Sequence, residues 1–137
     1  MTETLIISTC DTNIVVYHYA LDNPKAEAAT AALRSCSFLS VQVLNEYTNV
    51  ARRKQNLPWS EISDDVADLI SGIGVVRSIE VADNRHARRI ANRYQLSFYD
   101  SLMLAVALSG GARTIYSEDL QHGLVIDDTL RIVDPFR

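Results

Sequence analysis

Short apolar runs alternate with segments of helical periodicity along this chain, and this alternation limits the folds that are open to it. The predicted strands are residues 5–10 (LIISTC), 36–40 (CSFLS), 74–81 (GVVRSIEV), 112–117 (ARTIYS) and 130–136 (LRIVDPF). The predicted helices are residues 23–35, 41–54, 61–71, 84–95 and the apolar segment after Asp100, and residues 118–128 are a predicted loop. Alternating strands and helices favour a mostly parallel sheet that is covered on both faces. We therefore predict the α/β class, as a three-layer α/β/α sandwich.

Length and composition are those of an ordinary globular protein. The chain has 137 residues, 47% hydrophobic and 22% charged, which predicts a single domain over residues 1–137. No apolar run reaches the roughly 18 residues that a membrane span needs, and the N-terminus lacks the basic start of a secretory signal. Cys10 and Cys36 have no metal-binding spacing, so we predict reduced, buried thiols in a cytoplasmic protein without a membrane partner.

Polar residues that open helices recur along the chain. Ser40, Ser60, Asp83 and Asp100 each precede a segment of helical periodicity, and each is a favoured N-cap type. Apolar residues occupy every position from Leu102 to Leu108, so the segment after Asp100 is predicted to be buried. Asp100 can thus be interpreted as a helix cap, as a metal ligand, or as both.

Three acidic residues are predicted to meet at one edge of the sheet. Asp11 follows the first strand and Asp119 follows the strand at residues 112–117, while Asp100 opens the helix leading into that strand. Sites in open α/β sheets form outside the carboxyl ends of the strands. Each residue also has an ordinary interpretation, because Asp is common in caps and Asp11 begins the cap-forming run DTN. Asp119 can equally be a solvated loop acid.

Glu46 is a fourth candidate, and it lies within a predicted helix. Val43 and Val50 share its face, so the carboxylate is expected at the margin of the core, although a partly exposed helical Glu is an equally ordinary interpretation. Carboxylates that lie close together repel, and a cation relieves this repulsion. Carboxylate ligands favour Mg²⁺ or Mn²⁺ over zinc, and such ions support phosphodiester cleavage.

The segments CDTNIVVY, VLNEYTNV, FYDSLMLAVAL and IYSEDLQHG, taken in this order, resemble the PIN-domain ribonucleases. Among these, the chain is most similar to the VapC-type toxins of bacterial toxin–antitoxin pairs, and the resemblance spans nearly its whole length. The resemblance implies that the catalytic and metal-binding residues are Asp11, Glu46, Asp100 and Asp119. It implies supporting roles for Thr12, Asn13, Ser117 and, less directly, Glu118.

The resemblance also implies an activity and partners. The implied activity is that of a Mg²⁺- or Mn²⁺-dependent endoribonuclease, which cuts RNA to leave a 5′ phosphate and a 3′ hydroxyl. The implied assembly is a homodimer, and the implied partner is an inhibitory antitoxin protein. PIN domains also serve in RNA maturation, so a processing nuclease that is not a toxin stays open. Two other classes are open as well. One is a catalytically silent α/β binding module. The other is a haloacid-dehalogenase-like phosphatase, whose nucleophile motif needs an Asp where this chain has Asn13.

Basic residues form two clusters that could contact RNA phosphates. One is a stripe with a period of four residues on the helix at 84–95, and the other ends the helix that carries Glu46. Their members are Arg85, Arg89, Arg93, Arg52, Arg53 and Lys54. A solvated helix face is the ordinary interpretation. The chain has 13 basic and 17 acidic residues, so its excess of four acids equals the four candidate ligands and does not oppose RNA binding.

Overall fold

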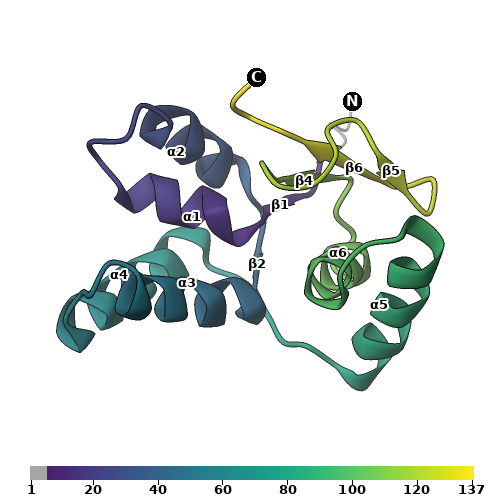
Figure 1. The fold of residues 1–137 in the computed structure, drawn as a ribbon, viewed down its shortest axis with the longest axis horizontal. Helices are drawn as coiled ribbons and strands as arrows, with labels where there is room; N and C mark the ends of the chain where they lie inside the picture. The colour runs from purple at the N-terminus through teal and green to yellow at the C-terminus, as the bar shows by residue number, and fades with distance from the viewer. Residues whose placement is uncertain (1–5) are drawn as a thin grey trace, which may run out of the picture.

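A computed structural model describes residues 6–137 and contains a mostly parallel central sheet (Figure 1). The sheet has the strand order β1-β4-β6-β5, formed by β1 (Ser8–Cys10), β4 (Thr114–Tyr116), β6 (Leu130–Val133) and β5 (Val125–Ile126). β1, β4 and β6 run parallel, and β5 is antiparallel to β6. A second pair, β2 (Leu39–Ser40) and β3 (Val76–Arg77), is also parallel. The predicted α/β fold with a mostly parallel sheet is confirmed.

Ser37 and Phe38, which lead into β2, lie beside β1 and extend the layer of strands. The Ser37 amide donates to the Ser8 carbonyl at 2.7 Å, and the Thr9 hydroxyl donates to the Phe38 carbonyl at 2.7 Å. These contacts bring the beginning of the following helix, which carries Glu46, close to β1. The sheet therefore joins segments that are far apart in the sequence.

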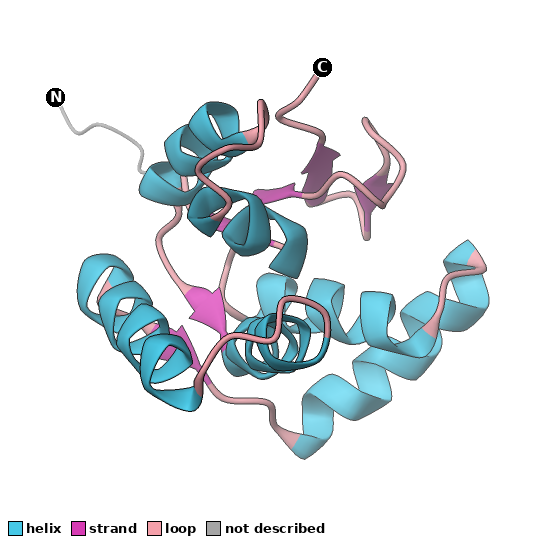
Figure 2. Ribbon diagram, turned by 60° about the vertical axis from the view of Figure 1, so that its left-hand side comes forward, coloured by secondary structure: helices cyan, strands magenta, loops and turns pink. Residues whose placement is uncertain are grey.

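Helices flank the strands on both sides. They are α1 (Thr12–Tyr19), α2 (Ala26–Ser35), α3 (Val41–Arg53), α4 (Trp59–Ile73), α5 (Val81–Tyr94) and α6 (Phe98–Ser109). In Figure 1, α1 to α4 lie to one side of β1 and β2, and α5 and α6 lie to the other. Figure 2 shows the same flanking arrangement after a turn of 60°. Within residues 6–137, no helix combines the length and apolarity needed to cross a membrane.

The apolar segment after Asp100 forms the buried helix that the sequence predicts. Leu102 to Ala107 are at most 6% exposed, and Ala105 and Val106 are fully buried. Other predicted helix faces also pack inward, with Val43 and Tyr47 of α3 at most 1% exposed. Ile70 of α4, by contrast, is 44% exposed.

Three predicted helix caps are wrong, because each of these helices begins two or three residues earlier than predicted. Ser97, not Asp100, caps α6, and its hydroxyl accepts from the Asp100 amide at 3.2 Å. Glu80 caps α5 and forms a capping box with Asp83, which lies in the first turn. Pro58 precedes α4 in place of the predicted cap Ser60. The Ser40 cap of α3 is confirmed, because its hydroxyl accepts from the Gln42 amide at 3.1 Å.

Two elements differ from the sequence prediction. Helix α1 was not predicted, because Ile14, Val15 and Val16 are β-branched and typical of strands. The predicted loop at 118–128 contains β5, which is too short to show an alternating pattern. The predicted first strand is observed at Ser8–Cys10, and Leu5 lies outside the described residues.

Candidate metal centre

The loops after β1 and β4 lie side by side, because these two strands are adjacent and parallel. Cys10 pairs with Tyr116 at the carboxyl end of the ladder, and the Asp11 amide donates to the Tyr116 carbonyl at 2.9 Å. Asp11 therefore begins its loop next to the segment that contains Ser117 and Asp119. The sheet places these residues at a single edge, where α/β folds commonly form their sites.

Asp11 is a buried carboxylate with two donors from the protein. Its side chain caps α1, as Oδ1 accepts from the Thr12 amide at 2.7 Å. Oδ2 accepts from the hydroxyl of Ser117, which is itself fully buried, at 3.0 Å. Asp11 is 9% exposed, so these two bonds fix its orientation largely out of bulk water.

The pKa of Asp11 is raised from its ordinary value of 3.8 to about 6. Burial is the main cause, since it disfavours the charged carboxylate, and the bonds from Thr12 and Ser117 oppose the rise. The negative charges of Glu46 and Asp100 raise the pKa further. Glu46 and Asp100 therefore each lie close enough to Asp11 to interact with it electrostatically.

Glu46 is half-buried on α3, and neighbouring side chains hold both of its oxygens. Oε2 accepts from the Thr12 hydroxyl at 2.6 Å, and Oε1 accepts from the Gln42 side-chain amide at 3.0 Å. Thr12 thus connects Asp11, through its backbone amide, with Glu46, through its hydroxyl. Gln42 was not among the predicted site residues, although its position one turn before Glu46 was a usable signal.

Asp119 and Asp100 complete the set of predicted acids. Asp119 is exposed, and its Oδ2 accepts from the Asn13 side-chain amide at 2.5 Å. Asp100 is half-buried in the first turn of α6. Because Ser97 supplies the cap, the Asp100 carboxylate is not used in capping the helix.

The oxygen donors of this edge match the preference of a hard divalent cation. Among residues 6–137, however, no group of three or more Asp, Glu, His or Cys side chains is placed to hold a metal ion. Mg²⁺ is commonly bound through one or two carboxylates and retains several waters. The donor set therefore fits a hydrated ion bound by few protein oxygens.

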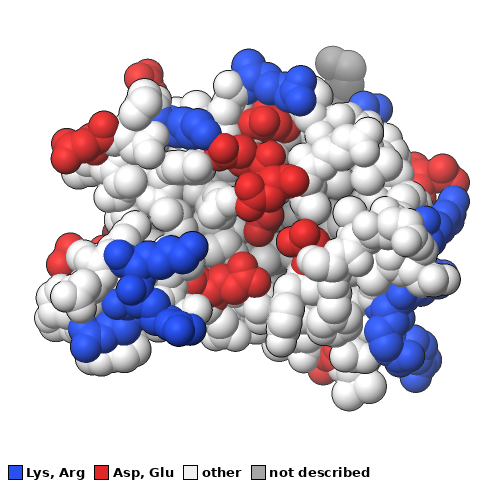
Figure 3. Space-filling view, in the orientation of Figure 1, with Lys and Arg blue, Asp and Glu red and all other residues white. Residues whose placement is uncertain are grey.

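Acidic side chains gather in a column down the middle of the face shown in Figure 3, and basic side chains lie on both sides of it. The predicted cluster of Arg52, Arg53 and Lys54 is exposed at the end of α3. Arg89 and Arg93 on α5 are 69% and 64% exposed, and they approach Asp127 at 3.4 and 3.8 Å. The α5 stripe is therefore accessible but partly neutralised.

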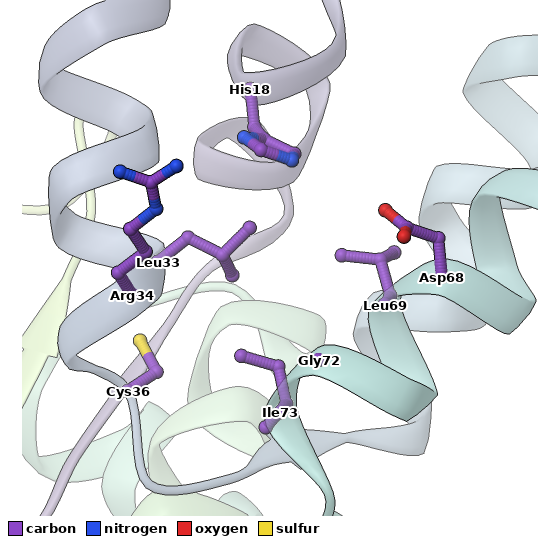
Figure 4. A pocket seen from close by; sticks show the side chains of 8 residues that line it. All are labelled: His18, Leu33, Arg34, Cys36, Asp68, Leu69, Gly72 and Ile73. Atoms are coloured by element: carbon purple, nitrogen blue, oxygen red, sulfur yellow. The ribbon is translucent and has the colours of Figure 1, made fainter.

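A separate cavity of about 240 Å³ lies between α1, α2 and α4 (Figure 4). Leu33, Leu69 and Ile73 supply apolar lining, with His18 and Arg34 facing Asp68 across the opening. Burial lowers the pKa of His18. None of the four predicted acids lines this cavity, so it is distinct from the carboxylate edge.

A mostly parallel sheet flanked by helices places the chain in the α/β class. The family model of the PIN domain matches residues 9–124. The chain belongs to the PIN domain family. No match to a curated protein was found.

Solved structures of similar fold include components of toxin–antitoxin systems. A toxin–antitoxin complex from Klebsiella pneumoniae is 15% identical with a TM-score of 0.65, over 93% of this chain and 97% of that one. Mycobacterium tuberculosis VapC20, a sarcin–ricin loop cleaving toxin, is 18% identical with a TM-score of 0.66, over 82% and 91%. Rickettsia felis VapBC2, bound to a promoter DNA fragment, is 16% identical with a TM-score of 0.67, over 94% and 100%. At these identities the likeness establishes the shared fold.

Proposed function

We propose that this protein is a metal-dependent endoribonuclease and the toxin of a toxin–antitoxin pair. The observation that carries the proposal is the buried Asp11 carboxylate, whose pKa is raised to about 6 with contributions from Glu46 and Asp100. A cluster of like charges is costly unless a cation neutralises it. Membership of a family typical of metal-dependent nucleases supports the same interpretation.

Each residue has a distinct part in the proposed reaction. Asp11, Asp100 and Asp119 would hold Mg²⁺ or Mn²⁺, directly or through the waters that such an ion retains, and Glu46 would bind directly or through water. The bound ion supplies charge neutralisation at the phosphate and a more acidic water. Glu46, restrained by Thr12 and Gln42, orients the attacking water and accepts its proton. Attack at phosphorus breaks the bond to the 3′ oxygen, leaving a 5′ phosphate and a 3′ hydroxyl.

Support for the toxin role comes from the solved structures of the same fold. Two of them contain a toxin with its antitoxin, and a third is named as a toxin that cleaves the sarcin–ricin loop. By extension we propose a cytoplasmic homodimer that acts on structured RNA at exposed single-stranded positions. A cognate antitoxin then inhibits it.

The end chemistry of the products tests the proposed reaction. Purified protein is incubated with total RNA and Mn²⁺, and fragments are ligated to an adaptor that requires a 5′ phosphate. We expect new, protein-dependent 5′ ends at a small set of positions. Fragments that carry a 5′ hydroxyl instead would contradict the proposal, because they would mean that the bond from phosphorus to the 5′ oxygen is the one that breaks.

Replacing Arg85, Arg89 and Arg93 together with Gln should weaken RNA binding with little loss of stability. All three are exposed, and exposed ion pairs such as those with Asp127 contribute little. Each lost phosphate contact should flatten the log–log salt dependence by about 0.7 for single-stranded RNA, or by about 2 for three contacts. The measurement is RNA binding in EDTA across a salt series. Arg113→Gln, exposed at the opposite edge of the sheet, is the control, and an unchanged slope in the triple variant would assign the stripe to solvated surface.

A further inference from the structure

Three consecutive residues after β4 are each bound by a different side chain. Ser117 donates to Asp11 at 3.0 Å, and Asp119 accepts from Asn13 at 2.5 Å. Between them, Glu118 accepts from the ammonium of Lys25 at 2.5 Å. The bonds to Asp11 and Asn13 fix the ends of this short segment, and Lys25 balances the charge at its middle. Glu118 and its partner therefore influence how Asp119 is held.

Two aromatic rings lie beside the Lys25 end of the ion pair, whose side chains are 38% and 25% exposed. The Lys25 nitrogen lies 5.0 Å from the centroid of the Tyr17 ring and 5.3 Å from that of Phe136. The two rings meet edge to face, with centroids 5.3 Å apart. Tyr17 is one helical turn beyond Asn13 on α1, so a single helix contacts both Glu118's partner and Asp119. The pair thus joins α1, the α1–α2 connection, the β4 loop and the C-terminal segment.

Glu118 depends on Lys25 for its charge balance. Lys25 holds its Oε1, and no hydrogen bond reaches its buried Oε2 in the described part of the chain, although the Tyr17 hydroxyl lies close enough for Glu118 to raise the pKa of Tyr17. A buried carboxylate oxygen without a donor is costly, and loss of its one cation would leave the charge uncompensated. The Glu118 side chain is 25% exposed, so a movement of the loop can bring its buried oxygen into contact with water. Such a movement carries Asp119 with it, since the two residues are adjacent.

We propose that Lys25 is a positioning residue of the metal centre. By neutralising Glu118 beside the two aromatic rings, it keeps residues 117–119 in the arrangement that places Asp119 against Asn13. An effect of Lys25 on RNA cleavage rests on the proposed function. Its effect on the loop can be measured without RNA. Lys25 donates a hydrogen bond to Glu118 and acts through that residue. It is not proposed to contact the substrate.

The test compares removal of the cation with removal of the whole charge pair. The variants are Lys25→Met, Glu118→Gln, the double variant Lys25→Met/Glu118→Gln, and Lys25→Arg. In metal-free protein, hydrogen exchange at the Leu120 amide reports on the loop, because this amide donates to the Ser117 hydroxyl at 3.2 Å. Lys25→Met should accelerate this exchange about tenfold, and the double variant should restore it, because no uncompensated charge is left. Lys25→Arg should stay close to wild type, because it keeps the positive charge beside Glu118.

Mn²⁺ affinity, measured by calorimetry without RNA, gives the second readout. Lys25→Met should bind Mn²⁺ about tenfold more weakly, as is typical for loss of a residue that orients metal ligands. The double variant should recover the affinity, and Arg113→Met, which removes one positive charge at the opposite edge, should leave it unchanged.

Two results would overturn the positioning role. One is wild-type exchange and Mn²⁺ affinity in Lys25→Met. The other is a double variant as impaired as Lys25→Met, which would mean that Lys25 does not act by neutralising Glu118. Failure of the proposed function can be distinguished from failure of the positioning role. In that case the wild type would not cleave RNA, but the predicted differences in hydrogen exchange would still be observed.

Discussion

Replacing Asp100 with Asn should abolish metal-dependent RNA cleavage and leave the protein folded. The substitution keeps the size of the side chain, and Ser97 rather than Asp100 caps α6, so the helix does not need the carboxylate. What is lost is one negative charge beside Asp11 and Glu46, whose proximity the raised pKa of Asp11 reveals. Charge stabilisation around a catalytic ion contributes several kcal/mol, so we expect a fall in rate of about 10³-fold.

The measurement is single-turnover cleavage of RNA at saturating Mn²⁺, with unfolding by urea as the check on the fold. Asp64→Asn is a matched control, because Asp64 is exposed on α4 and is not among the site acids. Stability of metal-free Asp100→Asn should be equal to the wild type or slightly higher, because one like charge is removed. Cleavage at close to the wild-type rate would exclude Asp100 from the reaction.

The second large effect concerns the stability of metal-free protein. Asp11→Asn should raise the free energy of unfolding by about 2–3 kcal/mol at pH 7.5, since the folded-state pKa of about 6 lies some two units above the ordinary value. The sign follows from proton binding. Between pH 4 and 6 the unfolded chain releases its proton first, so the folded state loses stability as the pH rises and the buried carboxyl must ionise. Above the folded-state pKa the buried carboxyl is ionised and its full cost in stability is present. Asn cannot ionise, so the substitution removes this cost.

Asn at position 11 can still accept from the Thr12 amide, so the α1 cap is retained. Unfolding by urea in EDTA at pH 7.5 and pH 4 measures the effect. The gain should shrink below about 1 kcal/mol at pH 4, because Asp11 is then protonated in the folded state. Asp22→Asn, at an exposed loop position, should show no gain at either pH. An equal gain at both pH values would mean that ionisation of Asp11 is not its cause.

The sequence predicted the fold class and the nearness of the ends of β1 and β4, because both depend on strand order. Short apolar runs separated by helices restrict the chain to a parallel sheet, and a parallel sheet brings the ends of β1 and β4 together. Helix starts were less predictable. Glu80 and Ser97 each lie three residues before the acids that were predicted as caps, Asp83 and Asp100. Local sequence does not separate a cap from an acid in the first turn, because both are favoured near a helix N-terminus.

Contacts between distant segments were beyond sequence reasoning. Lys25 and Glu118 are 93 residues apart, and neither belongs to a spaced motif that would predict their pairing. The contact between Arg89 and Asp127 spans 38 residues and depends on the turn between β5 and β6, which the sequence pattern did not predict. Gln42 differs, because it lies one turn from Glu46 and its contact was within reach of helical periodicity.

The most direct test of the central claim is cleavage of an end-labelled RNA by purified wild-type protein in EDTA and in Mn²⁺, beside the Asp100→Asn protein purified in the same way. The account predicts no cleavage in EDTA, cleavage that rises with Mn²⁺ to saturation, and almost none by Asp100→Asn. Cleavage that persists in EDTA, or equal cleavage by both proteins, would contradict a carboxylate-bound ion at this edge of the sheet. Failure of the wild type to cut any RNA at saturating Mn²⁺ would instead favour a silent binding module.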